Sequence, residues 1–184
     1  MIRERDDAVS PVVGVMLMLV VVIIIAAVVS AYAGGTISGT KKSPQATISA
    51  SFSQSKGLDI YNNGGDTLNT QGITLIVKPT KSFGNYEHLT WVVNKSVIWT
   101  GGKPWVNASE SYTYNLARTF KPGDVASIGL KDLPYIQEKA GSTSDFTSHA
   151  YGFGHVDNIG NSFVLSINDE SGKPIASTEV QIQP

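Results

Sequence analysis

The sequence predicts a long N-terminal hydrophobic α-helix followed by an all-β domain, an antiparallel sandwich. Three observations lead to this prediction. Residues 12–29 form an unbroken run of apolar residues and glycine. Every Phe, Tyr and Trp lies at or beyond Tyr32, so the composition changes after the run. Beyond it, apolar residues alternate with polar ones, as in half-buried strands, and turn-forming residues separate the alternating stretches.

The helix is expected over residues 8–35. Ser10 is suited to the N-cap and Pro11 to the first helical position, while Gly34 and Gly35 are suited to the end. The segment carries no charge, and 26 helical residues would measure about 39 Å, enough to cross a bilayer core of about 30 Å. We therefore predict a helix that can span a membrane.

Three interpretations of this segment compete. A cleaved secretory signal is suggested by the Ala31-Tyr32-Ala33 pattern, but the apolar run exceeds the usual length of about 7–15 residues and the leader is not clearly basic. A plain anchor with its N-terminus inside is weakly favoured by Arg3 and Arg5. The third interpretation is a helix that packs against copies of itself.

Small residues support this third interpretation. They recur four apart near the end of the run, and positions four apart share one face of a helix, where small side chains let helices approach closely. A lone anchor does not need such a face. The candidate packing residues are Gly14, Ala26, Ala27, Ser30, Ala31 and Gly34.

The stretch "RDDAVSPVVGVMLMLVVVIIIAAVVSAYAGG" closely resembles the N-terminal segment of archaeal type IV pilins, in which a charged leader precedes an "AVSP" start and an aliphatic helix. The resemblance is dense over residues 6–35. Two weaker resemblances follow, "LDIYNNGGDTLNTQGITLIV" at residues 58–77 and "FKPGD" at residues 120–124. The rest of the chain shows only general β character.

The resemblance implies a specific fate for each part of the chain. Prepilin peptidase would remove residues 1–7, with Asp6 and Asp7 just before the cut and Ala8 as the new N-terminus. Residues 8–35 would form the membrane-spanning and later filament-core helix, and residues 36–184 an extracellular β-sandwich of pilin-like or immunoglobulin-like type. Bacterial pilins usually carry a glutamate where this chain has Val12, so packing here would rest on aliphatic contact.

Within the β domain, turn signals mark the expected connections. The stretch "NNGGDTLNTQG" between two apolar runs predicts a hairpin or a tight corner, and Asn94-Lys95 predicts a tight connection. Residues 163–182 predict a terminal hairpin around "NDESGKP". Residues 131–160 lack a clear period and are expected to form a long surface loop.

Two sequons, at Asn94 and Asn107, are candidate glycosylation sites because both fall in predicted turns of an exported domain. Asp66 follows an Asn-Gly run, but side chains that bond their own backbone explain that run better than a calcium site does. We expect no metal site and no cofactor. We also expect no enzymatic activity, because no catalytic motif occurs.

The charge is formally −1 and no basic tract occurs, so no nucleic-acid partner is expected, and the absence of Cys excludes disulfides. The sequence predicts a structural subunit of an archaeal type IV pilus-like filament on the cell surface. It would polymerise through its helix, after residence in the membrane and handling by prepilin peptidase and the pilus assembly machinery, and would serve adhesion. The alternative is a membrane-anchored monomeric ectodomain that binds a ligand or supports the envelope.

Overall fold

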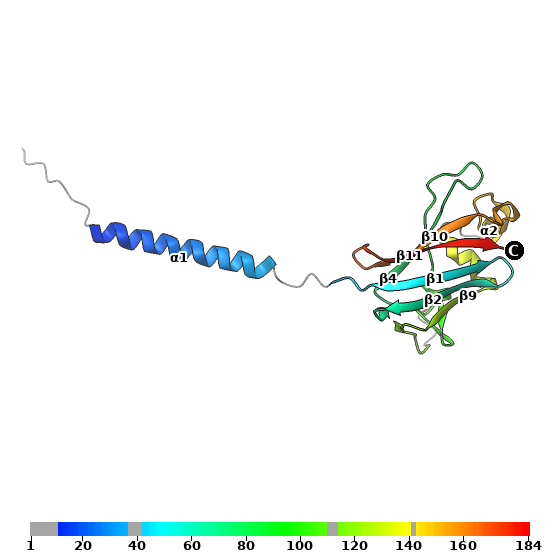
Figure 1. The fold of residues 1–184 in the computed structure, drawn as a ribbon, viewed down its shortest axis with the longest axis horizontal. Helices are drawn as coiled ribbons and strands as arrows, with labels where there is room; N and C mark the ends of the chain where they lie inside the picture. The colour runs from blue at the N-terminus through cyan, green and yellow to red at the C-terminus, as the bar shows by residue number, and fades with distance from the viewer. Residues whose placement is uncertain (1–10, 37–41, 110–113, 141–142) are drawn as a thin grey trace, which may run out of the picture. The chain divides into compact units, whose positions relative to one another are not determined.

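The computed structural model describes residues 11–36, 42–109, 114–140 and 143–184, in two compact units divided between Lys42 and Ser43 (Figure 1). Each unit is described by itself. The leader 1–7, the cleavage residues Asp6, Asp7 and Ala8, and the N-cap candidate Ser10 lie outside the described residues.

The first unit contains one continuous helix, α1, from Pro11 to Thr36. Pro11 and Thr36 are the first and last described residues of this segment, so the predicted start and N-cap are not tested. Gly34 and Gly35 do not end the helix, because it continues through them to Thr36. Two glycines near a helix end cost only about 1 kcal/mol each relative to Ala, so they weaken the last turn without stopping it.

The second unit is a nine-stranded sheet in the order β5-β4-β10-β11-β1-β2-β9-β6-β7, with a separate pair β3-β8. The strands of the large sheet are β1 (Ala46–Ser53), β2 (Gly57–Gly65), β4 (Ile73–Pro79), β5 (Trp91–Val92), β6 (Trp99–Thr100), β7 (Lys103–Pro104), β9 (Val125–Gly129), β10 (Ser162–Asp169) and β11 (Pro174–Gln183). The pair consists of β3 (Leu68–Asn69) and β8 (Thr119–Phe120).

The described strand pairs are antiparallel except β1 and β11, which run parallel with Phe52 opposite Ile182. The predicted fold class, an N-terminal apolar helix followed by an antiparallel β domain, is confirmed with this one parallel pair added. The predicted terminal hairpin is also present, since β10 pairs with β11.

The sheet curls back on itself. In a flat sheet, seven steps of about 4.8 Å would separate β5 from β6 by about 34 Å, whereas the seven residues from Val92 to Trp99 span at most about 25 Å. Only a curved sheet allows this short connection, which contains the 3₁₀ helix η1 (Lys95–Val97) capped by Asn94. The tight connection predicted at Asn94-Lys95 therefore joins strands near opposite ends of the sheet.

The predicted turn begins later than expected, because Asn62 to Gly65 are the last residues of β2 and pair with β1. The connection from β2 to β4, residues 66–72, is a corner and not a hairpin. β2 pairs with β1 and β9, whereas β4 pairs with β10 and β5. Between them, Leu68 in β3 pairs with Phe120 in β8, which holds the corner against the "FKPGD" stretch. The chain thus crosses from one half of the sheet to the other here.

Residues 131–160 are not a surface loop, so that prediction was wrong. They lie in η2 (Leu130–Ala140), α2 (Thr143–Ser148), η3 (Val156–Asn158) and the turns between them, and their buried apolar side chains join the core. Phe153 is the most connected of these. Its ring stacks on Phe163 at 4.5 Å and meets Phe52 and Trp91 edge-on at 6.2 and 5.6 Å. This segment therefore covers part of the core instead of lying on the surface as a loop.

Candidate assembly helix and polar sites of the β domain

Helix α1 presents an exposed apolar surface. The side chains from Val12 to Tyr32 are all exposed, and this 21-residue stretch has a mean hydropathy of 3.4 and no charged residue. At about 1.5–3 kcal/mol for each large apolar side chain, exposing such a surface to water would cost far more than a domain's whole stability. The helix is long and apolar enough to cross a membrane, and it needs either lipid or other helices around it.

The helix brings five of the six candidate packing residues to one side. At 100° per residue, Ala26, Ser30 and Gly34 form one line, and Ala27 and Ala31 form a second line beside it. Gly14 precedes Ala26 by 12 residues, which at 100° per residue is three full turns and a further 120°. Gly14 therefore lies on the other side of the helix. Gly14 therefore does not belong to the small-residue face, and we define that face as the other five positions.

The two sequons lie in irregular segments of the β domain. Asn94 is half-buried and its Oδ1 accepts a hydrogen bond from the backbone N–H of Ser96 at 2.9 Å, a turn that spans the sequon. Asn107 is half-buried too, and its Oδ1 accepts from the backbone N–H of Tyr114 at 3.2 Å. Both asparagines lie outside the strands, which agrees with their predicted place in turns. Glycosylation of either asparagine stays a prediction.

Sequence analysis missed a groove of about 430 Å³ that Asn94 helps to line. Its wall also includes Trp99 from β6, Tyr114, and Tyr135 with Lys131 and Asp132 from η2. These residues come from segments up to 41 positions apart, and no spacing in the sequence indicates that they meet. The wrong prediction of a loop for residues 131–160 hid the contribution of η2.

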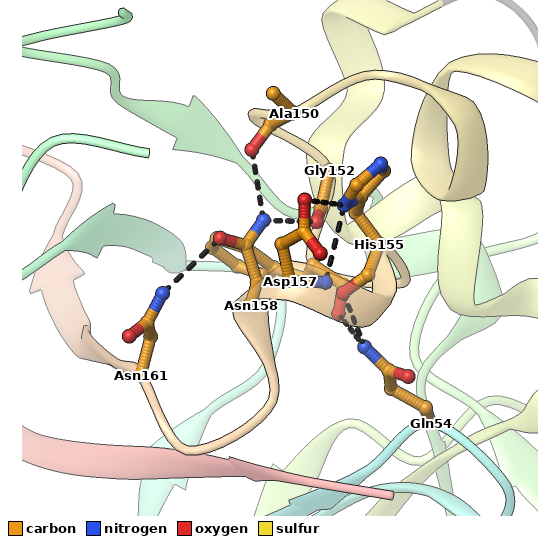
Figure 2. A network of polar contacts seen from close by, with 8 residues as sticks. Gln54, Ala150, Gly152, His155, Asp157, Asn158 and Asn161 are labelled. Atoms are coloured by element: carbon orange, nitrogen blue, oxygen red, sulfur yellow. Dashed lines mark hydrogen bonds and ion pairs between the residues drawn. The ribbon is translucent and has the colours of Figure 1, made fainter. Parts of the chain in front are cut away.

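A polar network fixes the segment that follows α2 (Figure 2). The side-chain amide of buried Asn158 donates to the carbonyls of Ala150 and Gly152 at 2.9 and 2.8 Å, and its oxygen accepts from Asn161. The Gln54 amide donates to the carbonyl of His155 at 3.0 Å. These buried polar groups are therefore hydrogen-bonded. Because buried polar groups need such partners, this pairing allows the irregular segment to pack against the core.

The histidine in this network acts as a cap. His155 precedes η3, and its Nδ1 accepts from the backbone N–H of Asp157 at 3.2 Å, with the Asp157 carboxylate 3.6 Å from the same nitrogen. Among the described residues, no three His, Asp or Glu side chains are grouped as a metal site would require. The bonds of His155 therefore order the start of η3.

Asn and Asp side chains bond their own backbone at two places, in the bulge of β2 opposite Thr47 and Ile48 and at the end of β10. The Oδ1 of Asn62 accepts from the N–H of Gly64 at 3.2 Å, and the Oδ1 of Asp169 accepts from the N–H of Ser171 at 2.9 Å. Hydrogen bonds from the hydroxyls of Ser171 and Ser43, in that order of importance, lower the pKa of Asp169 to about 2. Asn62 therefore stabilises a bulge within β2, and Asp169 stabilises the turn after β10.

The partly buried ammonium group of Lys95 also stabilises a turn. The Lys95 ammonium donates to the carbonyls of Thr70, Gln71 and Ile73 at 3.3, 2.9 and 3.0 Å. Burial lowers the pKa of Lys95, and the charge of Glu170 opposes this effect. Lys95 thus ties the connection between β5 and β6 to the corner between β3 and β4.

Comparison with known proteins bears on the N-terminal segment. Curated proteins give no match to the chain. Residues 7–48 match the family model described as archaeal type IV pilin, N-terminal. The matched stretch contains all of α1 and reaches into β1. Over these residues the chain is similar to archaeal type IV pilins, which confirms the resemblance seen in the sequence.

Proposed function

We propose that this chain is a structural, non-enzymatic subunit of an archaeal type IV pilus-like surface filament that polymerises through α1. Prepilin peptidase removes residues 1–7, and the mature chain begins at Ala8. The helix resides in the cell membrane until the pilus assembly machinery transfers it into the filament, where copies of α1 form the core. The β domain forms the outer surface and serves adhesion, with glycans on Asn94 and Asn107.

The observation that carries this proposal is the combination of α1 with the family match. A helix with 21 consecutive exposed, mostly apolar positions and no charge has two stable environments, lipid and a bundle of similar helices. The transfer from one to the other replaces apolar contacts with apolar contacts, so it changes the burial energy little. The small-residue face near the end of α1 would allow close helix approach in the second environment.

The alternative function is a monomeric ectodomain anchored in the membrane. The length and hydropathy of α1 favour it as much as they favour a pilin, because a single anchor needs only these two properties. It requires neither removal of the leader nor self-association. Those two events therefore separate the two functions.

The first experiment determines the N-terminal residue and the intact mass of the protein purified from its native cells. A start at Ala8 is expected, and the mass beyond that of residues 8–184 reports any glycans. A start at Met1 would favour the plain anchor, and a start at Gly34 would indicate a secreted domain. Either result would overturn the proposal. Electron microscopy of sheared cell-surface material then tests whether the Ala8 form is present in filaments.

A further inference from the structure

The groove of about 430 Å³ in the β domain has a defined frame. The hairpin β6–β7 contributes Trp99 and Pro104, which pair with each other, and η1 contributes Ser96. The first part of η2 contributes Tyr135, whose carbonyl accepts from the backbone N–H of Asn94 at 3.2 Å. Because backbone hydrogen bonds connect these segments, the shape of the groove is built into the fold.

Three aromatic rings contribute to the apolar surface of the groove, together with Val97, Pro104, Val106 and Ala108. Trp99 is 37% exposed, Tyr114 47% and Tyr135 45%. The rings of Trp99 and Tyr114 meet edge to face, with centroids 6.1 Å apart and an angle of 68° between their planes. Such rings provide large, rigid contact faces at little cost in conformational entropy.

The polar groups of the groove are mixed and balanced. Lys131 and Asp132 contribute one positive and one negative charge, so the groove has no net charge to select an ionic ligand. The ammonium donates hydrogen bonds, whereas the carboxylate accepts them.

We propose that this groove binds a neutral oligosaccharide. A sugar presents patches of C–H groups that fit aromatic faces and hydroxyls that both donate and accept. A proline-rich peptide also fits aromatic-lined grooves, but its backbone presents mainly acceptors and would leave Asp132 without a partner. The volume lies in the range of about 300–1,000 Å³ typical of small-ligand sites. This inference names a ligand class for the adhesion included in the proposed function. It rests on the proposed function in one respect, that the β domain lies outside the cell.

The test is calorimetric titration of the full chain, made in a host without N-glycosylation and held in micelles of a detergent without sugar head groups. The probes are chitotetraose, cellotetraose, maltotetraose and a mannotetraose, with a decaproline peptide as the competing ligand class. We expect at least one tetrasaccharide to bind at millimolar concentration or below and decaproline not to bind. The variants Trp99→Ala and Tyr135→Ala should weaken binding by about tenfold or more, the loss typical of an aromatic contact residue.

The matched control is Tyr61→Ala, because Tyr61 is 37% exposed on β2 and does not line the groove. It should bind as the unchanged chain does, and all variants should show the same melting temperature within a few degrees. Lys131→Ala is a third groove variant, at an exposed position where folding is not at risk, and it should also weaken binding. Absence of binding to all four sugars, equal binding by the Trp99 and Tyr61 variants, or binding of decaproline alone would each overturn the inference. None of these results bears on leader removal or filament assembly.

Discussion

The backbone N–H of Phe153 donates to Oε1 of Gln137 at 2.8 Å, and both residues are completely buried. The Nε2 of the same amide donates to the carbonyl of Tyr151 at 3.0 Å. Gln137 lies where the backbone of η2 departs from helical geometry, at φ −113° and ψ 64°. One side chain thereby pairs two backbone groups that no helix or sheet satisfies, and it holds the ring of Phe153 in the core.

Replacing Gln137 with Leu should therefore destabilise the β domain. The side chain keeps nearly the same size, but the buried N–H of Phe153 and the half-buried carbonyl of Tyr151 lose the Gln137 amide. Each such loss costs about 1–3 kcal/mol, so the free energy of unfolding should fall by about 2–6 kcal/mol. Chemical denaturation of the two chains measures the difference.

The control is Gln181→Leu, at an exposed position of β11, which should change the free energy of unfolding by less than about 0.5 kcal/mol. An equal and small effect at both positions would mean that the Gln137 hydrogen bonds contribute nothing to holding residues 149–155.

The contrast between α1 and residues 131–160 shows what the sequence could predict. Helix α1 follows from local properties alone, because length, apolarity and the absence of charge are sufficient. The alternation of apolar and polar residues likewise predicts strands such as β10 and β11, and the turn residues between these two predict their hairpin. Residues 131–160 combine the 3₁₀ helices η2 and η3 with the short α-helix α2. Their place depends on the amides of Gln137, Asn158 and Gln54, and these tertiary hydrogen bonds leave no period in the sequence.

Dependence on tertiary contacts also explains why the sequence did not predict the groove. Trp99, Asn94 and Tyr135 meet only because the sheet curls and η2 packs beside η1, and neither event is encoded in a short motif. By contrast, the two sequons were found as local motifs, and the structure adds that Asn94 borders the groove. Sequence reasoning thus found the local features and missed the features that depend on long-range packing.

Lys95→Met should destabilise the β domain without removing the sequon at Asn94 to Ser96. The substitution keeps the length of the side chain but removes the ammonium that donates to three carbonyls. Hydrogen bonds from a charged donor contribute about 1.5–3 kcal/mol, and the free energy of unfolding should fall by that amount. Lys78→Met, at an exposed position of β4, is the control and should be nearly neutral. Equal stability of the two variants would contradict the role assigned to Lys95.

Asp169 should make the turn between β10 and β11 sensitive to acid. Because hydrogen bonds lower its pKa from 3.8 to about 2 in the folded chain, the ionised form stabilises the fold above about pH 4. This contribution is lost as the pH falls from about 4 to about 2. The Asp169→Asn variant lacks it at every pH, so its deficit in unfolding free energy should be present at pH 6 and shrink toward pH 2.

Ser43→Ala removes one of the two hydroxyl donors to Asp169 and should give a smaller deficit with the same pH dependence. Chemical denaturation at a series of pH values measures both variants. A deficit for Asp169→Asn that stays constant from pH 6 to pH 2 would show that the carboxylate charge is irrelevant to the turn.

Asp7→Pro should hinder removal of the leader. The proposed cut lies between Asp7 and Ala8, and proline fixes φ and removes the N–H at the position just before the cut. The precursor should then accumulate, as a shift of the intact mass by the mass of residues 1–7. Glu4→Pro places the same residue further from the cut and should be processed more nearly as the unchanged chain is. Unaltered processing of Asp7→Pro would move the proposed site.

Ala27→Trp and Ala31→Trp should block filament assembly while leaving membrane insertion intact. Both positions lie on the small-residue face, where an indole would hold a neighbouring helix away and lose the close contacts on which packing in an apolar environment depends. The indole remains compatible with a membrane, so the membrane fraction should still contain the mature chain. Electron microscopy and cell fractionation provide the two measurements.

Val29→Trp is the matched control, because residue 29 is two positions from both alanines and therefore points about 160° away from each. It adds the same ring to the same turn of the helix on the opposite side. If close approach occurs along the small-residue face, this variant assembles better than the two alanine variants do. Normal filaments from Ala27→Trp would refute the filament-core role of that face, and equal failure of all three variants would mean that α1 is packed tightly on every side, with no preferred face.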